Sequence, residues 1–170
     1  MKKILITGGL GFIGFHLASV LSEEADNYIT IVDNLTRGKL DKYSLKLLEK
    51  SNLSFIEGDI VEQSFVKSLG SGFDEVYHLA AVIGVKNVIE HPDRVLNVNI
   101  IGTMNILNWM VAGNAKKLLF SSTSEAYAWT QNIIDPIIPT PESIPLSLTD
   151  LTNPRSSYAL SLIHISEPTR

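Results

Sequence analysis

The sequence predicts an α/β fold built on a doubly wound parallel sheet, and three observations predict it. Short apolar runs alternate along the chain with segments of helical periodicity. The first apolar run ends in a cluster of glycines, and the second ends in an aspartate. Strands that alternate with helices favour a parallel sheet covered on both faces. We expect the strand order 3-2-1-4-5, with the switch point between strands 1 and 4.

Five buried strands are expected where β-branched and other apolar residues form short runs, at 3–7, 28–32, 53–57, 75–79 and 117–121. Helices are expected over 12–22, 42–50, 62–69 and 92–112. In the first helix, Ile13, Leu17, Val20 and Leu21 share one face, which should meet the sheet. Five of the seven prolines lie within 135–154, so this stretch is predicted to be a long loop.

Length, net charge and the absence of cysteine exclude several classes of function. A chain of 170 residues suffices for one domain, and its net charge of −4 without a basic run argues against nucleic acid or an anionic membrane as partner. Without cysteine, thiolate catalysis and cysteine metal sites are excluded, and no metal site is expected. No uninterrupted apolar run reaches membrane-spanning length, and the glycines interrupt the apolar start, so a cytoplasmic protein is expected.

The glycines at 8, 11 and 14 follow a strand and open a helix, which is the context of a dinucleotide-binding turn. Gly8 permits a tight turn, Gly11 lets the backbone approach a pyrophosphate, and Gly14 lets the helix pack closely on the sheet. A glycine cluster alone fits a flexible turn equally well. Together with Asp33, placed to accept hydrogen bonds from a ribose, it predicts a Rossmann-like NAD site. The nearby Arg37 could pair with the 2′-phosphate of NADP, so that cofactor stays an alternative.

Further candidates follow the third and fourth strands. Asp59 is placed where a carboxylate could meet an adenine amino group, and small residues at 80 and 81 would let the backbone lie against the cofactor. His78, a single histidine at a strand end, is interpreted as structural. The expected cofactor contacts are Gly8, Gly11, Phe12, Ile13, Gly14, Asp33, Asn34, Asp59, Ile60, Leu79, Ala80, Ala81 and Asn99.

Several motifs occur together in one order: 7–14 (TGGLGFIG), 33–35 (DNL), 58–59 (GD), 78–81 (HLAA), 99–103 (NIIGT), 121–127 (SSTSEAY) and 153–159 (NPRSSYA). In this combination the chain resembles the extended short-chain dehydrogenase/reductase family, in its NAD-dependent epimerase/dehydratase branch. The resemblance implies an enzyme that modifies a nucleotide sugar through a transient 4-keto intermediate. It also implies that the parent protein is a homodimer.

The resemblance assigns a role to each matched residue. Thr123 corresponds to the residue that hydrogen-bonds the sugar hydroxyl being oxidised, Tyr158 to the catalytic base, and Glu125 to the glutamate of some dehydratases and decarboxylases. Asn99 would support the site from the long helix. Ser124 stands where some dehydratases carry aspartate, which disfavours that subclass.

One family feature is missing. The family carries lysine four residues after the tyrosine, where its ammonium binds the nicotinamide ribose and lowers the tyrosine pKa; this chain has Leu162 there. Residues 160–170 (LSLIHISEPTR) match, residue for residue, a translated transposon-based sequencing adapter. We therefore expect an incomplete NAD-binding domain at 1–159, truncated before the substrate domain, and a non-native tail at 160–170. The alternative is a natural NAD-binding sensor without turnover.

Overall fold

The structure is a computed structural model, and it describes residues 1–127, 130, 138–148 and 151–166. The chain divides into two compact units. The first consists of residues 1–81 and 102–121, and the second of residues 82–101 together with the described part of 122–170. Each unit is described by itself.

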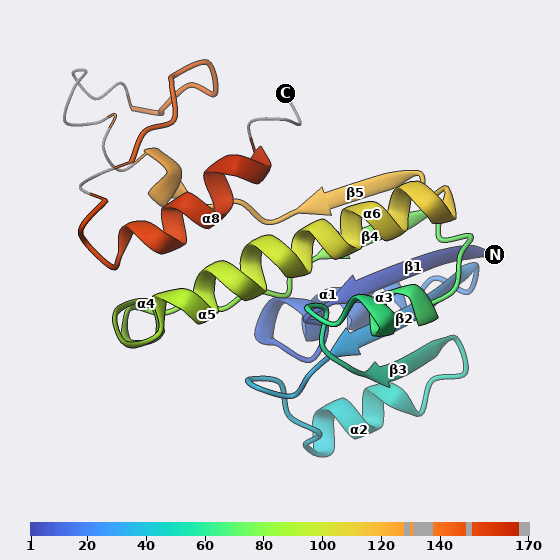
Figure 1. Cartoon of the computed structure of the whole chain (residues 1–170). Helices are drawn as coiled ribbons and strands as arrows, with labels where there is room; N and C mark the ends of the chain where they lie inside the picture. The colour runs from blue at the N-terminus through green and yellow to red at the C-terminus, as the bar shows by residue number, and fades with distance from the viewer. Residues whose placement is uncertain (128–129, 131–137, 149–150, 167–170) are drawn as a thin grey trace. The chain divides into compact units, whose positions relative to one another are not determined.

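A five-stranded sheet forms the centre of the first unit, and its order β3-β2-β1-β4-β5 confirms the prediction (Figure 1). All paired strands are parallel. The strands are β1 (Lys2–Thr7), β2 (Asn27–Asp33), β3 (Leu53–Glu57), β4 (Glu75–His78) and β5 (Lys117–Phe120), each within one residue of its expected bounds. The register pairs Thr7 with Val32 on one side and with His78 on the other, so three strands end together at the carboxyl edge.

Both faces of the sheet are covered, because successive strand residues point to opposite sides. Ile4 and Ile6 pack in a core with Ala18 of α1 (Phe12–Leu21) and Leu47 of α2 (Lys42–Leu48). Leu5 points the other way, into a core under α3 (Gln63–Ser68) and α6 (Thr103–Gly113). The Asp41 side chain caps α2 by accepting from the N–H groups of its second and third residues.

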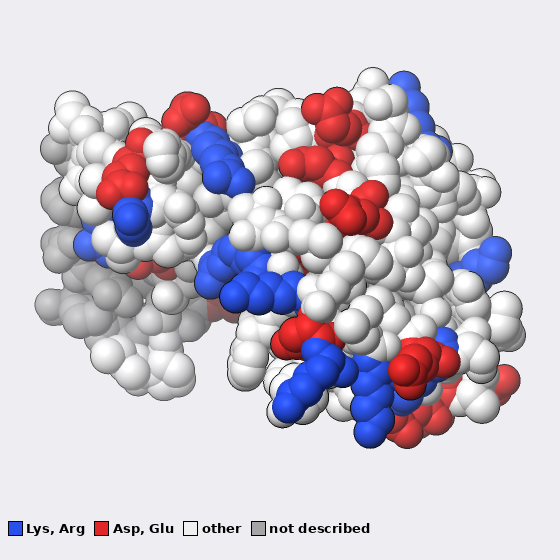
Figure 2. All heavy atoms as spheres, turned by 90° about the horizontal axis from the view of Figure 1, so that it is seen from below, with Lys and Arg blue, Asp and Glu red and all other residues white. Residues whose placement is uncertain are grey.

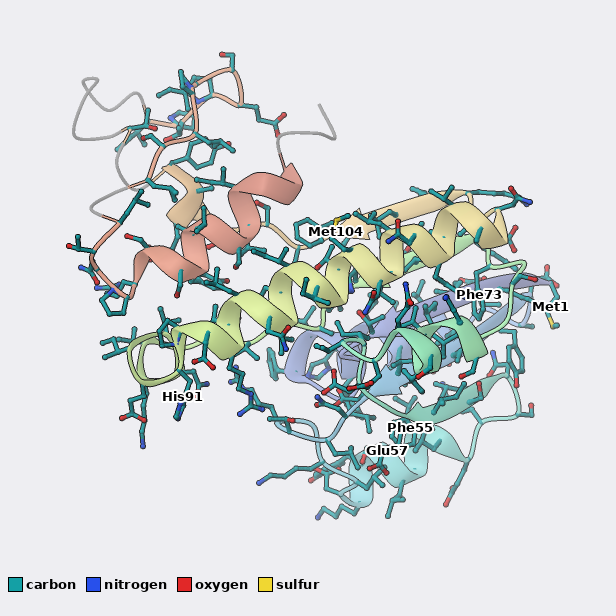
Figure 3. All side chains as sticks on the ribbon, in the orientation of Figure 1. Met1, Phe55, Glu57, Phe73, His91 and Met104 are labelled. Carbon is teal, nitrogen blue, oxygen red and sulfur yellow. The ribbon has the colours of Figure 1, made fainter. Side chains whose placement is uncertain are left out.

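An aromatic pair closes the core under α6. Phe73, labelled in Figure 3, precedes β4 and packs against Trp109, with ring centroids 5.3 Å apart and ring planes 58° apart. A tilted contact of this kind is favourable for aromatic rings beyond the area that it buries. The pair therefore anchors the C-terminal half of α6 to the sheet.

The face of α1 that meets the sheet differs from the expected one. Leu17 and Leu21 pack against the core as predicted, but Ile13 is 66% and Val20 is 68% exposed, so the prediction is wrong for these two. Gly14 and Ala18 are the buried residues. A Cβ on Gly14 would lie 2.4 Å from the Gly8 carbonyl oxygen, so α1 comes too close to the turn for large side chains on this face.

The predicted helix 92–112 is present but is not uniform. It consists of α5 (Pro92–Leu96), a π-helical segment η1 (Asn97–Gly102) and α6, and it ends at Asn114 in the left-handed conformation. A short helix α4 (Val85–Glu90), which the sequence analysis did not predict, precedes it after Gly84 at φ +99°. Among the described residues, 92–113 form the one helix that is long and apolar enough, by length and mean hydropathy, to cross a membrane, although charged and polar residues interrupt its apolar sequence. Core helices of soluble proteins pass the same test of length and hydropathy, and Ile106, Trp109 and Met110 of this helix belong to the core.

The second unit contains α4, α5, a 3₁₀ turn η2 (Ser124–Tyr127) and α8 (Ser156–Ser166). Helix α8 packs against both α5 and η2. Residues 138–148 and 151–155 contain neither helix nor strand, which confirms the predicted loop for these residues; 135–137 and 149–150 lie outside the described residues.

Charged side chains of both signs are interspersed on the face drawn in Figure 2. Ion pairs form at the amino ends of β1, β4 and β5: Lys2 with Glu75 at 2.8 Å and Lys116 with Asp74 at 2.6 Å. The hydrogen bond from Lys2 lowers the pKa of Glu75, and the hydrogen bond from Lys116 lowers the pKa of Asp74. These pairs lie at the edge of the sheet opposite to the glycine turn and Asp33, which follow β1 and end β2.

Candidate functional site

The glycine turn lies at the carboxyl end of β1. The Gly8 N–H donates to Val32 O at 2.8 Å, and the Gly11 N–H donates back to Gly8 O at 3.1 Å. Gly8 has φ +68°, and a Cβ there would lie 2.8 Å from the backbone of Ala80. Gly11 is the N-cap of α1, and among the described residues no side chain caps this helix. The N-terminus of α1 is therefore available to an anion. Side chains in place of the glycines would occupy the space beside it.

Asp33 is buried at the end of β2, and its carboxylate is fixed by the protein itself. One oxygen accepts from the Leu10 N–H at 3.1 Å and the other from the Leu35 N–H at 2.8 Å. Each carboxylate oxygen can accept more than one hydrogen bond. The residue therefore still fits the ribose contact expected of it, and two backbone groups hold it in place.

A contact between Asn34 and Asp59 joins the candidates after β2 and β3. Asn34 Nδ2 donates to one Asp59 oxygen at 3.0 Å, and the Val61 N–H donates to the other at 3.0 Å. Ile60, next to Asp59, is buried in the core under α6. Asp59 and Asn34 are thus brought together, while the Ile60 side chain has mainly a packing role.

Leu79, Ala80 and Ala81 follow β4 beside the glycine turn. The Leu79 N–H donates to Thr7 O at 3.1 Å, and the Ala80 N–H lies 3.3 Å from Thr7 Oγ1. His78 before them is buried, and burial lowers its pKa to about 4. Its ring is hydrogen-bonded on both sides, so the prediction of a structural histidine agrees with the geometry.

Phe12 and Ile13, the other expected contacts of the turn, lie at the start of α1. Phe12 is 83% exposed, and its ring meets that of His16 edge-on at 5.0 Å. Together with Ile13 it presents apolar surface beside the uncapped helix N-terminus. Both side chains are therefore accessible at the end of the helix where the cofactor contact is expected.

The expected catalytic residues Thr123, Glu125 and Tyr158 all belong to the second unit. Thr123 Oγ1 accepts from the Glu125 N–H at 3.3 Å, which begins η2. Tyr158 is half-buried on α8, the helix that packs against η2. Glu125 is exposed, and its carboxylate lies 4.0 Å from Arg155 Nη2 just before α8. Packing of η2 on α8 therefore brings the short segments that carry these residues together.

Asn99 lies in the π-helical segment and is buried. Its side chain pairs with both backbone groups of Val82: Oδ1 accepts from the N–H at 2.8 Å, and Nδ2 donates to the carbonyl at 3.2 Å. Nδ2 also lies 3.2 Å from Ser161 Oγ on α8. These contacts are all made within the second unit, and they hold the Asn99 amide against Val82 and α8.

Leu162 occupies the position of the expected lysine and is 3% exposed. Its alkyl side chain is packed inside the second unit, one helical turn after Tyr158. It offers neither a charge nor a hydrogen-bond donor at this position.

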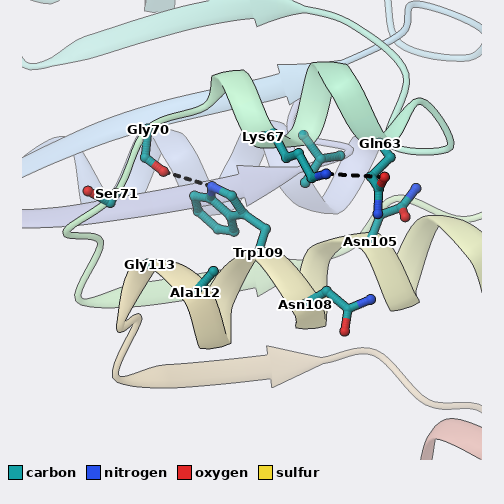
Figure 4. Close-up of a pocket in the computed structure, with 10 residues that line it drawn as sticks. Gln63, Lys67, Gly70, Ser71, Asn105, Asn108, Trp109, Ala112 and Gly113 are labelled. Atoms are coloured by element: carbon teal, nitrogen blue, oxygen red, sulfur yellow. Dashed lines mark hydrogen bonds between the residues drawn. The ribbon is translucent and has the colours of Figure 1, made fainter.

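A groove of about 220 Å³ lies between α3 and α6 in the first unit (Figure 4). Trp109 lines it and donates from Nε1 to Gly70 O at 2.7 Å, while Lys67 and Gln63 form its rim. None of the expected site residues lines this groove.

Sequence reasoning missed two parts of the site. Gly38 packs against Asp33, where an added Cβ would lie 2.9 Å from Asp33 Oδ1, and Leu35 adopts a positive φ of 57°. Asn105 and Thr103 on α6 hydrogen-bond the segments after β3 and at the end of β4. Gly38 indicated only a loop, and the motif 99–103 included Thr103 without assigning it a contact, while nothing in the helical pattern distinguished Asn105.

The parallel sheet, the glycine turn after β1 and the acid after β2 define a Rossmann-type dinucleotide-binding domain. The model of the NAD dependent epimerase/dehydratase family matches residues 4–169. The chain belongs to this family.

The chain is also similar to individual members. It is 42% identical over 126 residues to a UDP-N-acetyl-alpha-D-glucosaminuronate decarboxylase of Bacillus cytotoxicus, covering 74% of this chain and 38% of that protein. It is 34% identical over 139 residues to a bifunctional UDP-glucose 4-epimerase and UDP-xylose 4-epimerase of Pisum sativum, covering 78% of this chain and 39% of that protein.

Among solved structures, the UDP-glucose 4-epimerase of Thermotoga maritima with UDP-glucose superposes with a TM-score of 0.81 at 30% identity. The match covers 99% of this chain and 50% of that one. The chain thus spans half or less of the length of these relatives.

Proposed function

We propose that this chain is the N-terminal, NAD-binding part of an enzyme that epimerises, dehydrates or decarboxylates a nucleotide sugar through a transient 4-keto sugar. The observation that carries the proposal is the glycine turn, whose backbone packs against Ala80 beside the fixed carboxylate of Asp33. The names of the relatives, which are epimerases and decarboxylases of UDP-sugars, support the substrate class.

The chain contains residues suited to binding the cofactor and residues suited to proton transfer at the sugar. The chemistry that bound NAD would supply is reversible hydride transfer at the sugar carbon. The uncapped N-terminus of α1 would hold the pyrophosphate, and Asp33 would accept hydrogen bonds from the adenosine ribose. Tyr158 would take the proton of the sugar hydroxyl, Thr123 would orient that hydroxyl, and Glu125 would move a proton next to the new ketone.

The first test of this proposal is the binding of NAD⁺ to the whole chain, measured by isothermal titration calorimetry. We expect NAD⁺ to bind at least about tenfold more tightly than NADP⁺, because the Asp33 carboxylate repels a 2′-phosphate. In Asp33→Asn, which loses charge and one acceptor for the loop amides, we expect the Kd for NAD⁺ to rise by about tenfold or more.

Asp26→Asn is the matched control, since Asp26 is an exposed acid just before the same strand. Its Kd should stay within about twofold of the wild-type value. Equal affinity for NAD⁺ and NADP⁺, or no binding of NAD⁺ by the folded chain, would contradict the proposal.

The buried Leu162 favours a second candidate, a protein that binds NAD without turnover. We propose instead that residues 160–170 are a non-native tail and that the natural gene continues with lysine near position 162. Sequencing the source locus through and beyond the codon for Ala159 decides between the two. A lysine codon followed by a substrate domain supports the enzyme, while a genomic Leu162 followed by a stop codon supports the sensor.

The finer expectations on partners and location belong to the same proposal. A second copy of the parent protein would be its partner, through the helix that carries Tyr158. With a net charge of −4, neither nucleic acid nor a membrane is proposed as a partner, and a cytoplasmic location is proposed for the enzyme.

A further inference from the structure

The first turn of α6 contacts the ends of two strands that are not neighbours in the sheet. Asn105 Nδ2 donates to the carbonyl of Ile60 at 2.9 Å and to that of Val61 at 2.8 Å, directly after Asp59. Thr103 Oγ1 lies 2.9 Å from Nε2 of His78, the last residue of β4. Because β2 and β1 lie between β3 and β4, this turn spans the edge that carries Asp33 and the glycine turn.

The contact at Thr103 continues through the imidazole to the glycine turn. His78 Nδ1 lies 2.6 Å from Thr7 Oγ1, and Thr7 immediately precedes Gly8. The same oxygen accepts from the Ala80 N–H at 3.3 Å. We assign the Thr7 proton to the bond with Nδ1, which is the arrangement in which His78 carries its hydrogen on Nε2. A neutral ring with hydrogen on Nε2 then donates to Thr103, which satisfies every member of the chain of bonds.

The hydrogen-bonded side chains of Thr7, His78 and Thr103 are buried, which restricts their conformations. The His78 ring stacks on Phe120 at the end of β5, with centroids 5.9 Å apart. A Cβ on Gly102, the residue before Thr103, would lie 2.6 Å from Ile60 Cδ1, so the start of α6 also sits closely on the segment after β3. A buried polar network of this kind specifies one arrangement of the backbone around it.

We propose that Thr103, acting through His78, is a positioning residue for the dinucleotide. With Asn105 it fixes the spacing between the Asp59–Ile60 segment on one side and the Gly8 turn with Ala80 on the other. This inference rests on the proposed binding of NAD, and it adds to that proposal two buried residues of α6 that hydrogen-bond the segments carrying the expected cofactor residues.

The test compares the NAD⁺ affinity of three variants of the whole chain by calorimetry, each verified as folded by its thermal transition. Thr103→Val keeps the shape but leaves Nε2–H of His78 without its acceptor, and we expect its Kd to rise by about tenfold. Thr103→Ser keeps the hydroxyl and should stay within about threefold of the wild type, even though it loses a buried methyl group and stability.

Thr30→Val is the matched control. Thr30 is a buried threonine in the middle of β2, and its hydroxyl bonds Ser54 Oγ at 3.2 Å, away from the carboxyl edge. This variant should lose stability while its Kd stays within about twofold. If Thr103→Val does not fold, Asn105→Ala tests the other contact of the same turn, with an expected rise in Kd of about fivefold.

The outcomes separate the two proposals. A folded Thr103→Val chain with wild-type affinity, or equal weakening in Thr30→Val, overturns the positioning role and leaves NAD binding intact. A wild-type chain that binds no NAD⁺ overturns the proposed function and the positioning role together. Loss of affinity in Thr103→Val with recovery in Thr103→Ser supports the positioning role.

Discussion

Acidification from about pH 7.5 to about pH 5 is expected to lower the free energy of unfolding by about 2 kcal/mol through His78 alone. Burial lowers the pKa of His78 from 6.5 to about 4 in the folded protein. Between these values the unfolded chain binds the proton and the folded chain does not. The stability is therefore complete above pH 6.5 and is lost as the pH falls toward 4. Urea unfolding at several pH values measures this slope.

His78→Gln is the control, because glutamine keeps a donor and an acceptor but does not titrate. Its stability at neutral pH should be lower, but its slope between about pH 5 and pH 6.5 should be smaller than that of the wild type by the His78 contribution. Asp74 and Glu75 act at lower pH, since their ordinary values of 3.8 and 4.5 are lowered further. An equal slope in both proteins would show that His78 is accessible to protons in the folded state.

Gly14→Ala is expected to destabilise the protein by about 3 kcal/mol or more and to abolish NAD⁺ binding. The added Cβ would lie 2.4 Å from Gly8 O and 2.5 Å from Gly9 Cα, and both are backbone atoms that cannot move without opening the turn. Helix α1 would have to leave the sheet, and its N-terminus would move with it. Thermal unfolding and calorimetric titration with NAD⁺ measure the two effects.

Gly113→Ala makes the same chemical change at the end of α6, where the nearest atom to the new Cβ would be 3.5 Å away. Alanine is favoured over glycine in a helix, so this variant should be neutral or more stable by up to about 1 kcal/mol. It should bind NAD⁺ like the wild type. Similar losses in both variants would mean that α1 does not depend on the close approach at Gly14.

The elements that were predicted correctly are those marked by residues close together in the sequence. The β-branched runs gave all five strands within one residue, and the alternation with helices gave their order. Asp33 and the glycines at 8, 11 and 14 were recognisable because their spacing relative to a strand has a direct geometric reason.

The parts that were missed depend on distances between elements. Periodicity placed Ile13 and Val20 toward the sheet, but the close approach of α1 reserves that face for Gly14 and Ala18. The contacts of Thr103 and Asn105 join segments 25 and 45 residues apart. The motif 99–103 includes Thr103, but it does not show that the hydroxyl reaches His78, and no motif includes Asn105. Helix α4 has only six residues and begins without a capping side chain, so the sequence gives little signal for it.

The fixed carboxylate of Asp33 has a consequence for the thermodynamics of ligand binding. The N–H groups of Leu10 and Leu35 hold its two oxygens, and Gly38 closes against it, within the folded chain itself. This side of the site is therefore preorganised, and a ligand that meets it does not have to order the loop. The free energy that arranges residues 33–38 belongs to folding, so substitutions that loosen this loop should weaken stability and affinity together.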